Sequence, residues 1–598
     1  MKVSRNFISK IIVAIAGLAL ICGVPAIGQV IKGSMSGTVT DPQGAVISGA
    51  QVKATKTDTG EVSTTTSDSS GLFRLSLIPA GLYKIEISAQ GFKTQVQSGI
   101  QVTAGSDKGL GLLKLAVGES STTVEVTSAA PLVETSQAQV TNTFSGTTLQ
   151  TFSGIQENQG LDNLALFVPG VASSRDNNFS NTNGGLGFSS NGLRGRNNDQ
   201  EIDGQDNNDN SVTGPALIFT DPNFVQQYVL ITNNFGPEYG RNAGSVVNII
   251  TASGTNNWHG SVYGNENNSV LNGLPMDEKV AGLTAPPRAN DVFAGATVGG
   301  PFVKNKLFFF GGFDTEIVST STSDISGTIT PTPAGISLLS SCFPGSVAVA
   351  NLAKFGPYGI SGGNPTPGAI SASSASIPGC GTIPEATVSR LLSTPTDIYN
   401  FITRLDWQAS NRDTVSGRYV YSNTDAINTN AFGSAAAGYP ANVPALSQIV
   451  LLSWTHNFSP RMVNEFRVGF DRLSVQFGGN NIGNTIPTIA NISSAITDLN
   501  FTDATTLSFG VPSGAPQGRY NNTWQGQDNW SYVMGKHQLK MGVNYTHQQT
   551  PSTFLPGVNG QFNFSSLANY IANTPSATLF TVGDPEIGFK EDNTFLYV

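Results

Sequence analysis

The 598-residue chain has little charge, and this scarcity excludes several classes of protein. Charged residues make up 12% of the chain, about half the ~25% that is usual for soluble globular proteins. The 31 basic and 40 acidic residues leave a net charge of −9, which argues against both charge-driven disorder and a basic nucleic-acid-binding face. Beyond the N-terminus the chain also lacks the run of about 20 apolar residues that a spanning helix needs.

Glycine and phenylalanine, by contrast, are abundant, with 67 and 33 residues, and the mean hydropathy is only −0.06. A β-rich, glycine-rich and charge-poor chain is typical of secreted β-proteins and outer-membrane barrels. The sequence therefore predicts a mainly β protein.

The N-terminus predicts export. A basic segment, an apolar run and small residues follow one another as Lys2, Arg5 and Lys10, then 11–21, then Ala26 and Gly28. This order is typical of a signal peptide, which we assign to residues 1–28. An uncleaved anchor helix is the alternative, and the prolines and glycines of the segment argue against it.

Cysteine is scarce, and its placement favours a disulfide. After cleavage only Cys342 and Cys380 remain, within one Gly/Pro/Ser-rich stretch. Exported proteins with an even cysteine count tend to pair them. Two thiols without a nearby histidine do not make a zinc site.

Short alternating strands and turns fill residues 29–118 and predict a small β-sandwich. The run G-x-V-x-D-x-x-G-x-x-I-x-G-A-x-V begins at Gly37, and D-x-x-G-x-F and P-A-G-x-Y follow it. These motifs resemble the carboxypeptidase regulatory-like domain. The resemblance implies a structural module without catalytic residues.

A Ser/Thr/Val-rich linker over 119–139 contains one β-prone string, formed by Thr123, Val124, Glu125, Val126 and Thr127. Such a string is able to join the sheet edge of a partner through main-chain hydrogen bonds. An ordinary linker strand explains it equally well, and both interpretations stay open here.

Residues 140–256 carry the most specific motifs of the chain. L-R-G-R and I-D-G are followed by F-G-P-E-Y-G-R and V-V-N-I-I-T, in that order, over roughly a hundred residues. The set resembles the plug of TonB-dependent outer-membrane receptors, in particular the Oar-like group, which carries a regulatory-like domain in front. The linker departs from the usual TonB-box wording of that family.

The resemblance implies an α/β plug inside a transmembrane barrel, and TonB as a periplasmic partner. It also implies contacts between charged plug residues and the barrel wall, which we assign to Arg194, Arg196, Glu238 and Arg241. Solvated surface is the alternative for these four. Buried ion pairs would hold a plug and yet release it, because desolvation offsets much of their attraction.

Residues 257–598 predict part of a barrel. Phe401, Leu405 and Trp407 alternate with Arg404 and Asp406, as a strand between lipid and water requires. Short turns alternate with long polar loops, expected over 318–397, 425–446, 475–519 and 549–591. About ten strands fit, whereas the family closes its barrels with 22, so we expect the chain to be an N-terminal fragment.

The sequence contains partial matches to catalytic and metal-binding motifs, but their surroundings do not suit those functions. We therefore predict no catalytic residue, no metal and no cofactor. The G-x-S-x-G match at 359–363 lies in a Gly/Pro/Ser loop. Asp203, Asp206 and Asp209 lack the terminal glutamate of a calcium loop. The four histidines have no metal spacing.

Two hypotheses follow. The first is a TonB-dependent outer-membrane transporter that takes up an extracellular solute, such as a glycan or a siderophore, with its N-terminal domain in the periplasm. The second is an adhesin or structural outer-membrane protein on the same scaffold. The sequence predicts no enzyme and no nucleic-acid partner.

Overall fold

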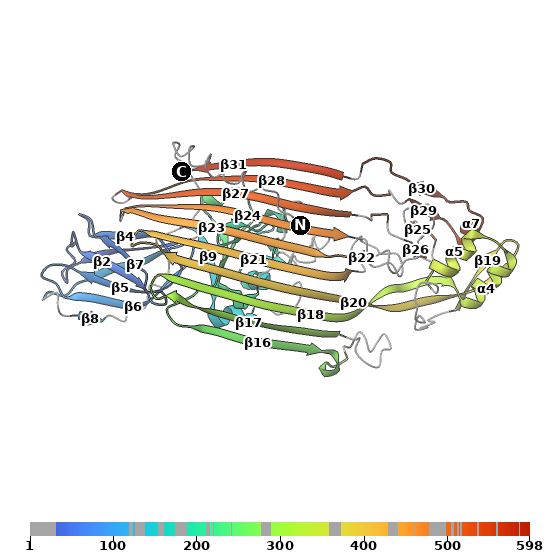
Figure 1. The fold of residues 1–598 in the computed structure, drawn as a ribbon, viewed down its shortest axis with the longest axis horizontal. Coiled ribbons are helices and arrows are strands. Elements are labelled where there is room, and N and C mark those ends of the chain that lie inside the picture. Colours follow the sequence, from blue (N-terminus) through green and yellow to red (C-terminus); the bar gives the residue numbers. More distant parts are fainter. Residues whose placement is uncertain are drawn as a thin grey trace, which may run out of the picture.

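The computed structural model divides the chain into four parts (Figure 1). A small β-domain lies at one end, a plug and a large curved sheet occupy the middle, and a folded outer unit lies at the other end. The structure describes residues 32–118, 123–125, 138–152, 161–173, 188–210, 216–218, 221–240, 242–274, 276, 289–357, 372–428, 441–459, 461–477, 498–503, 507–510, 513–514, 517–534, 537–557, 560–584 and 586–598. The proposed signal peptide and the 359–363 motif lie outside these residues.

The N-terminal domain is a sandwich of two sheets. One sheet has the order β4-β1-β7, and the other has the order β3-β2-β5-β6-β8. Their strands are β1 (Gly33–Thr40), β2 (Gln51–Lys56), β3 (Val62–Thr66), β4 (Leu72–Ile78), β5 (Gly81–Ser88), β6 (Thr94–Val102), β7 (Asp107–Lys114) and β8 (Thr123–Glu125). The period-2 pattern of the sequence buries one face of each sheet, and Met35, Phe73 and Tyr83 form the centre of the core.

The plug is built on a five-stranded sheet with the order β13-β12-β15-β14-β9. Its strands are β9 (Val140–Ser145), β12 (Asp199–Ile202), β13 (Gln205–Asp206), β14 (Val225–Asn233) and β15 (Val246–Thr251). Short helices accompany the sheet, namely α2 (Gly146–Phe152), η1 (Leu161–Phe167), η3 (Gly195–Asn197), η4 (Pro222–Phe224) and η5 (Pro237–Tyr239), with the hairpin β10 (Val171–Ser173) and β11 (Phe188–Ser190). Asp221 caps η4, where its side chain accepts a hydrogen bond from the Asn223 N–H, as the Asp-Pro start predicts.

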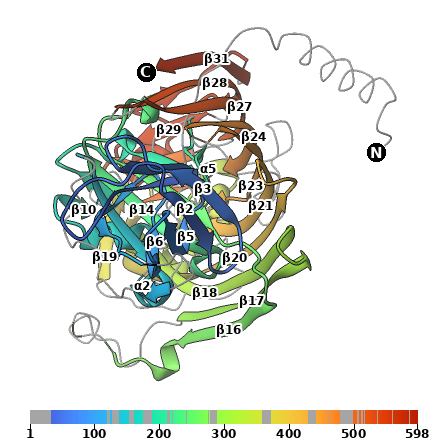
Figure 2. The same ribbon diagram turned by 90° about the vertical axis from the view of Figure 1, so that its left-hand side faces the viewer.

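The large sheet, here called the wall, has ten antiparallel strands along its main path. They are β16 (His259–Asn268), β17 (Ala289–Val303), β18 (Leu307–Pro331), β20 (Gly381–Gln408), β21 (Asp413–Asn428), β23 (Ala445–Ser459), β24 (Met462–Phe477), β27 (Gln517–Met534), β28 (His537–Phe554) and β31 (Glu586–Tyr597). The sheet curves around the plug without closing (Figure 2). None of the helices in the described part of the chain has the length and apolarity to cross a membrane.

The two faces of the wall differ as the alternation predicts. Phe401, Leu405 and Trp407 are 41%, 45% and 50% exposed on the convex face, while Ile402 and Arg418 are buried against the plug. Because apolar side chains cover the outer face, this surface is suited to lipid. The prediction of a two-faced wall of about ten strands is confirmed.

The outer unit corrects the prediction of long polar loops. β18 and β20 stay paired as far as Pro331 and Glu385, so the predicted loop over 318–397 was wrong in its outer strands. Serine, threonine and β-branched residues fill these extensions, and polar composition alone does not prevent a strand. Three loops then fold together as α4 (Pro333–Cys342), α5 (Val347–Phe355), α7 (Leu567–Ile571), β19 (Ala372–Ile377), β25 (Asp498–Phe501), β26 (Ser508–Phe509), β29 (Gln561–Phe564) and β30 (Ala577–Leu579).

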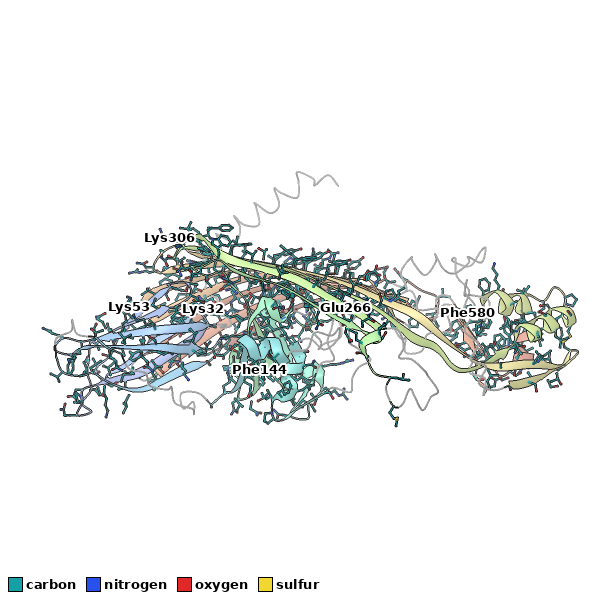
Figure 3. The ribbon with its side chains drawn as sticks, turned by 90° about the horizontal axis from the view of Figure 1, so that it is seen from below. Lys32, Lys53, Phe144, Glu266, Lys306 and Phe580 are labelled. Atoms are coloured by element: carbon teal, nitrogen blue, oxygen red, sulfur yellow. A yellow bond between two sulfur atoms is a disulfide. The ribbon has the colours of Figure 1, made fainter. Side chains whose placement is uncertain are left out.

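The outer unit has a core of its own. Phe501 packs against the rings of Phe509, Phe564 and Tyr570 at centroid distances of 5.4 to 6.5 Å. Figure 3 shows Phe580 on this unit, far from Lys53 of the N-terminal domain, with Phe144 of the plug between them. The three loops therefore form one folded body beyond the rim of the wall.

Candidate functional site at the plug and wall

The contact between plug and wall centres on one carboxylate, that of Asp203. This residue sits in the turn between β12 and β13, where its φ of 48° is one that aspartate tolerates better than most residues. The turn points the side chain at the wall. Asp203 lies 2.8 Å from Arg418 Nη1 and 3.4 Å from Arg404 Nη1.

The plug also holds the Asp203 carboxylate from behind. Its Oδ1 accepts a hydrogen bond from the Thr251 N–H at 3.0 Å, and its Oδ2 accepts one from Thr251 Oγ1 at 2.7 Å. Burial alone would raise the pKa of Asp203, but the two arginines and the Thr251 bonds outweigh it and hold the pKa below the usual value. The carboxylate is therefore charged at neutral pH.

Arg418 and Arg467 also hold the backbone of the β12–β13 hairpin that carries Asp203. Arg418 donates to the Ile202 carbonyl at 2.7 Å and to Gln205 Oε1 at 2.6 Å. Arg467, which is 1% exposed, donates to the Gly204 carbonyl at 3.2 Å. The wall thus grips the backbone of the β12–β13 turn as well as its carboxylate.

The buried arginine of β24 has its own counter-ion in the wall. Arg467 Nη2 lies 2.7 Å from Glu465 Oε2, and both side chains are nearly inaccessible to water. A buried charge without a partner is costly, so this pairing is a condition for placing Arg467 under the plug.

Two further ion pairs join plug and wall away from the centre. Arg519 Nη2 lies 2.8 Å from Asp209 Oδ2, and Lys540 Nζ lies 3.3 Å from Glu238 Oε1. In these pairs and in those of Asp203 the plug supplies the acid and the wall supplies the base. Each of these contacts thus joins an acid of the plug to a base of the wall.

The residues predicted for these contacts have different outcomes. Glu238 faces Lys540, as described. Arg194 is exposed and Arg196 is half-buried, and Arg241 lies outside the described residues, so wall contacts of these three arginines stay predictions. Three of the four predicted plug residues are arginines, whereas in the pairs described here the plug residue is an acid.

Sequence reasoning missed the wall arginines although their signal was present. Arg404, Arg418, Arg467 and Arg519 each occupy the water-facing register of a strand in a chain with few charges. Arg404 and Arg418 stand directly opposite each other on β20 and β21. Like charges in that position repel, so acids are needed beside them: Asp406 of the same strand pairs with Arg404, and Asp203 of the plug contacts both arginines.

The acidic residues considered for calcium have separate partners. Asp203 binds the two arginines and Asp209 binds Arg519, while Asp206 Oδ1 accepts the Asn208 N–H at 2.9 Å. Within the described ranges no group of three or more His, Cys, Asp or Glu side chains is arranged to hold a metal ion.

The candidate coupling segment is partly described. Thr123–Glu125 form β8, which pairs in parallel with Thr94–Val96 of β6 at the edge of the N-terminal domain. Val126 and Thr127 lie outside the described residues. The segment thus adds to a sheet edge, although the edge belongs to its own chain.

Cys342 and Cys380 are joined by a disulfide in the outer unit, with their Cα atoms 5.5 Å apart. The bond ties the end of α4 to the turn between β19 and β20.

Comparisons with known proteins give two family matches. The model of the family described as "Outer membrane beta barrel domain" matches residues 250–598. The model of the family described as "Carboxypeptidase regulatory-like domain" matches residues 34–115.

Individual proteins are similar over parts of the chain. A relative from Myxococcus xanthus, named TonB-dependent transporter Oar, is 29% identical over 317 residues, which are 50% of this chain and 28% of the relative. The outer membrane transporter YddB of Escherichia coli is 11% identical at a TM-score of 0.48, covering 76% of this chain and 53% of that one. The siderophore receptor PirA of Acinetobacter baumannii is 14% identical at a TM-score of 0.38, covering 69% of this chain and 48% of that one. The chain thus spans 28% of the length of the curated relative.

Proposed function

The chain belongs to the outer-membrane β-barrel family, and from this premise we propose that it is part of a TonB-dependent transporter that imports an extracellular solute. Family membership places the wall in the outer membrane. One observation carries the proposal: a folded plug lies against the inner face of the wall, where Asp203 forms ion pairs with Arg404 and Arg418, here called the Asp203 cluster.

The chemistry of that cluster suits a plug that is retained and also released. A buried ion pair adds little net stability over an apolar contact, because desolvation offsets the attraction. Its geometry is nevertheless specific, since an arginine binds a carboxylate only in a few orientations. The pairs thus define one position of the plug without making it permanent.

The energy in this proposal comes from the inner membrane and is transmitted by TonB, which would act on the segment around Thr123–Glu125. Strand pairing is the contact that β8 already makes with β6, so the segment is competent to pair with another strand. The name of the Myxococcus xanthus relative supports this assignment.

A pulldown with the TonB C-terminal domain tests the coupling. We expect the full-length protein to be retained, and we expect deletion of residues 119–130 to abolish retention. A deletion of 429–440, between β21 and β23, is the matched control and should leave retention unchanged. Undiminished binding after the first deletion would remove the assigned coupling segment.

The identity of the transported solute depends on what the outer surface of the protein binds. The proposal covers glycans and siderophores as candidate classes. Growth of a strain with and without the gene on candidate solutes, each supplied as the limiting nutrient, would identify the class. Absence of any uptake difference would contradict a transport role.

An adhesin or structural role is the second candidate, and the outer unit favours it. Three loops that share one apolar core and a disulfide form a rigid surface beyond the wall. A strain without the gene that loses attachment but no uptake would support this role in place of transport. The proposal includes no catalytic step.

A further inference from the structure

The N-terminal domain is not detached from the rest of the molecule but contacts the base of the plug. In Figure 2 its strands stand in front of the plug, inside the arc of the wall strands. In Figure 3 Lys306, in the short turn between β17 and β18, marks the end of the wall on which the domain sits. The domain therefore covers the mouth through which a solute would leave.

Two segments of the domain contact the wall, and its turn at Asp58 and Thr59 contacts Asn256, which lies between β15 of the plug and β16 of the wall. The Asn256 N–H donates to the Asp58 carbonyl at 2.9 Å, and Asn256 Nδ2 donates to the Thr59 carbonyl at 2.7 Å. Leu77, from the end of β4, packs on Val463 at the start of β24. Lys32 Nζ donates to Thr455 Oγ1 at 2.7 Å.

Two loops of the same domain contact the plug. Ala80 and Ala104 are buried in one cluster with Val229, Ile231 and Tyr239. The Ala104 N–H donates to Gln227 Oε1 at 3.4 Å. Plug and wall thus form one docking surface for the domain, made of these contacts and here called the seat.

The space behind this seat is lined in part by charged side chains and is not tightly packed. A cavity of about 90 Å³ lies where the domain, plug and wall meet, with Lys56 and Glu61 on one side and Asp203, Arg404 and Asp406 on the other. A cavity of this size has room for water. A domain that served only as a fixed base would be expected to fill such a space with packed side chains.

The contacts of the seat are also of a reversible kind. They are neutral hydrogen bonds of Asn256 and Ala104, one hydrogen bond from the Lys32 ammonium to a hydroxyl, and two small apolar contacts, in one of which the domain contributes two alanines. Each such hydrogen bond adds little net stability, because water replaces it when the surfaces part. The seat is therefore specific in position but weak.

The coupling strand is attached to this domain. β8 follows β7 after a short connection and pairs with β6 of the same sheet, and the chain then continues to the plug. A pull on β8 therefore acts on the domain directly, and on the plug only through the chain that follows.

We infer that the N-terminal domain is a second gate, which closes the inner mouth of the wall beneath the plug and undocks before a solute passes. This inference rests on the proposed transport function and extends it. Tension on β8 first lifts the domain from its seat, and only then does the plug have room to move.

A disulfide lock tests the gate in the full-length protein. A Cβ atom at Gly60 would lie 3.6 Å from Asn305 Cγ, the position that a cysteine Sγ takes at that residue, so we chose Gly60→Cys with Asn305→Cys as the pair to be cross-linked. Both positions have positive φ, so each single-cysteine variant, with heat-modifiable gel mobility as the folding check, accompanies the pair. Lys53→Cys with Glu86→Cys, which are paired across β2 and β5, is the matched lock within the domain.

The docked state predicts that the Gly60→Cys, Asn305→Cys disulfide forms in the periplasm. We expect the oxidised lock to reduce uptake to the level of the gene deletion, for a solute whose uptake needs the gene, and a reductant to restore it. The Lys53→Cys, Glu86→Cys lock should leave uptake unchanged. Normal uptake through the oxidised gate lock would overturn the gate, and failure of that lock to form in folded protein would overturn the docking.

A second readout does not depend on transport. In a planar bilayer, urea that loosens the plug should open an ion conductance in the Gly60→Cys, Asn305→Cys protein only after reduction. Equal conductance before and after reduction would overturn the gate. If no solute needs the gene while reduction still opens the conductance, the transport proposal fails and the gate stands.

Discussion

At the scale of single residues, Asp203 is the position where plug and wall depend most on each other. Asn replaces Asp203 without backbone strain, because both residues adopt left-handed φ readily. Asp203→Asn leaves Arg418, which is 4% exposed, without its carboxylate. Removing one member of a buried ion pair costs about 3–5 kcal/mol.

We therefore expect Asp203→Asn to raise amide hydrogen exchange in the β12 and β15 peptides of the full chain, by a factor that corresponds to several kcal/mol. Glu266→Gln, at an exposed carboxylate of β16, is the control and should change nothing in those peptides. Unchanged exchange in Asp203→Asn would show that the hairpin backbone contacts alone hold the plug.

Asp162 gives the plug a dependence on pH. Burial at the start of η1 raises its pKa to about 6 from an ordinary 3.8, against the hydrogen bond that Tyr228 donates. Folding therefore favours the protonated carboxyl, so its stabilising effect is complete below pH 3.8 and is lost as the pH rises through 6. The total change is about 3 kcal/mol.

We expect exchange in β14, corrected for the intrinsic effect of pH, to increase between about pH 4 and about pH 7. Asp162→Asn should remove most of that increase and protect β14 better at neutral pH. The peptides of β2 and β5, in the N-terminal domain, are the internal reference. A larger pH effect in Asp162→Asn than in the parent protein would contradict the assignment.

The sequence predicted only one acidic member of the site, Glu238, as a contact with the wall. Asp203 was considered for calcium alone, and no wall residue was assigned to either acid. Their partners Arg404, Arg418 and Lys540 lie about 200 to 300 residues further along the chain, and only the register of the wall strands brings them together. Local pattern does not encode that register.

At the scale of elements, the outer unit has a fold that the alternation of apolar and polar residues did not predict. The wall strands were predictable because each one faces lipid on one side and water on the other. The outer unit draws its core from α4, α5, β25, β29 and α7, and these short elements lack a sustained period. Leu339, Val349 and Phe501 are buried only because three loops meet, so no single segment predicted the fold.

The disulfide of Cys342 and Cys380 should stabilise this unit and not the wall. A cross-link that spans 38 residues stabilises a fold by about 4 kcal/mol in the chain-entropy model. We expect the double variant Cys342→Ser, Cys380→Ser to become more sensitive to protease within α4 and α5.

Heat-modifiable gel mobility of the double variant should stay that of the parent protein, because the wall core does not include either cysteine. Treatment of the parent with a reductant is the matched condition and should reproduce the protease pattern. A change in gel mobility would show that outer unit and wall depend on each other more than their separate cores indicate.

At the scale of the whole molecule, the separate cores predict separate unfolding. Plug residues such as Leu164 and Tyr228 and wall residues such as Ile402 and Leu473 share one core. The outer unit and the N-terminal domain each have another. Loosening of the plug is therefore expected to lower protection in the wall strands that contact it, whereas the two end domains should unfold independently.

Two truncations test this division. Phe73 is 1% exposed in the core of the N-terminal domain, and Phe509 is fully buried in that of the outer unit. Phenylalanine-to-alanine changes in such cores cost about 3–5 kcal/mol. Phe73→Ala should therefore lower the transition of the N-terminal domain alone, and Phe509→Ala that of the outer unit alone, as followed by hydrogen exchange against denaturant in detergent.

Each truncation is the matched control of the other, because both remove the same side chain.

The contact between the N-terminal domain and the plug adds a more specific expectation for Phe73→Ala. Once the N-terminal domain unfolds, Ala80 and Ala104 leave the cluster with Val229, Ile231 and Tyr239, so exchange should also rise locally at the base of β14. An increase there without any change in β20 and β21 is the result expected of a domain that covers the plug but does not hold the wall. Simultaneous loss of protection in all four parts would instead mean that the molecule unfolds as one unit, and a gate that undocks alone would then be excluded.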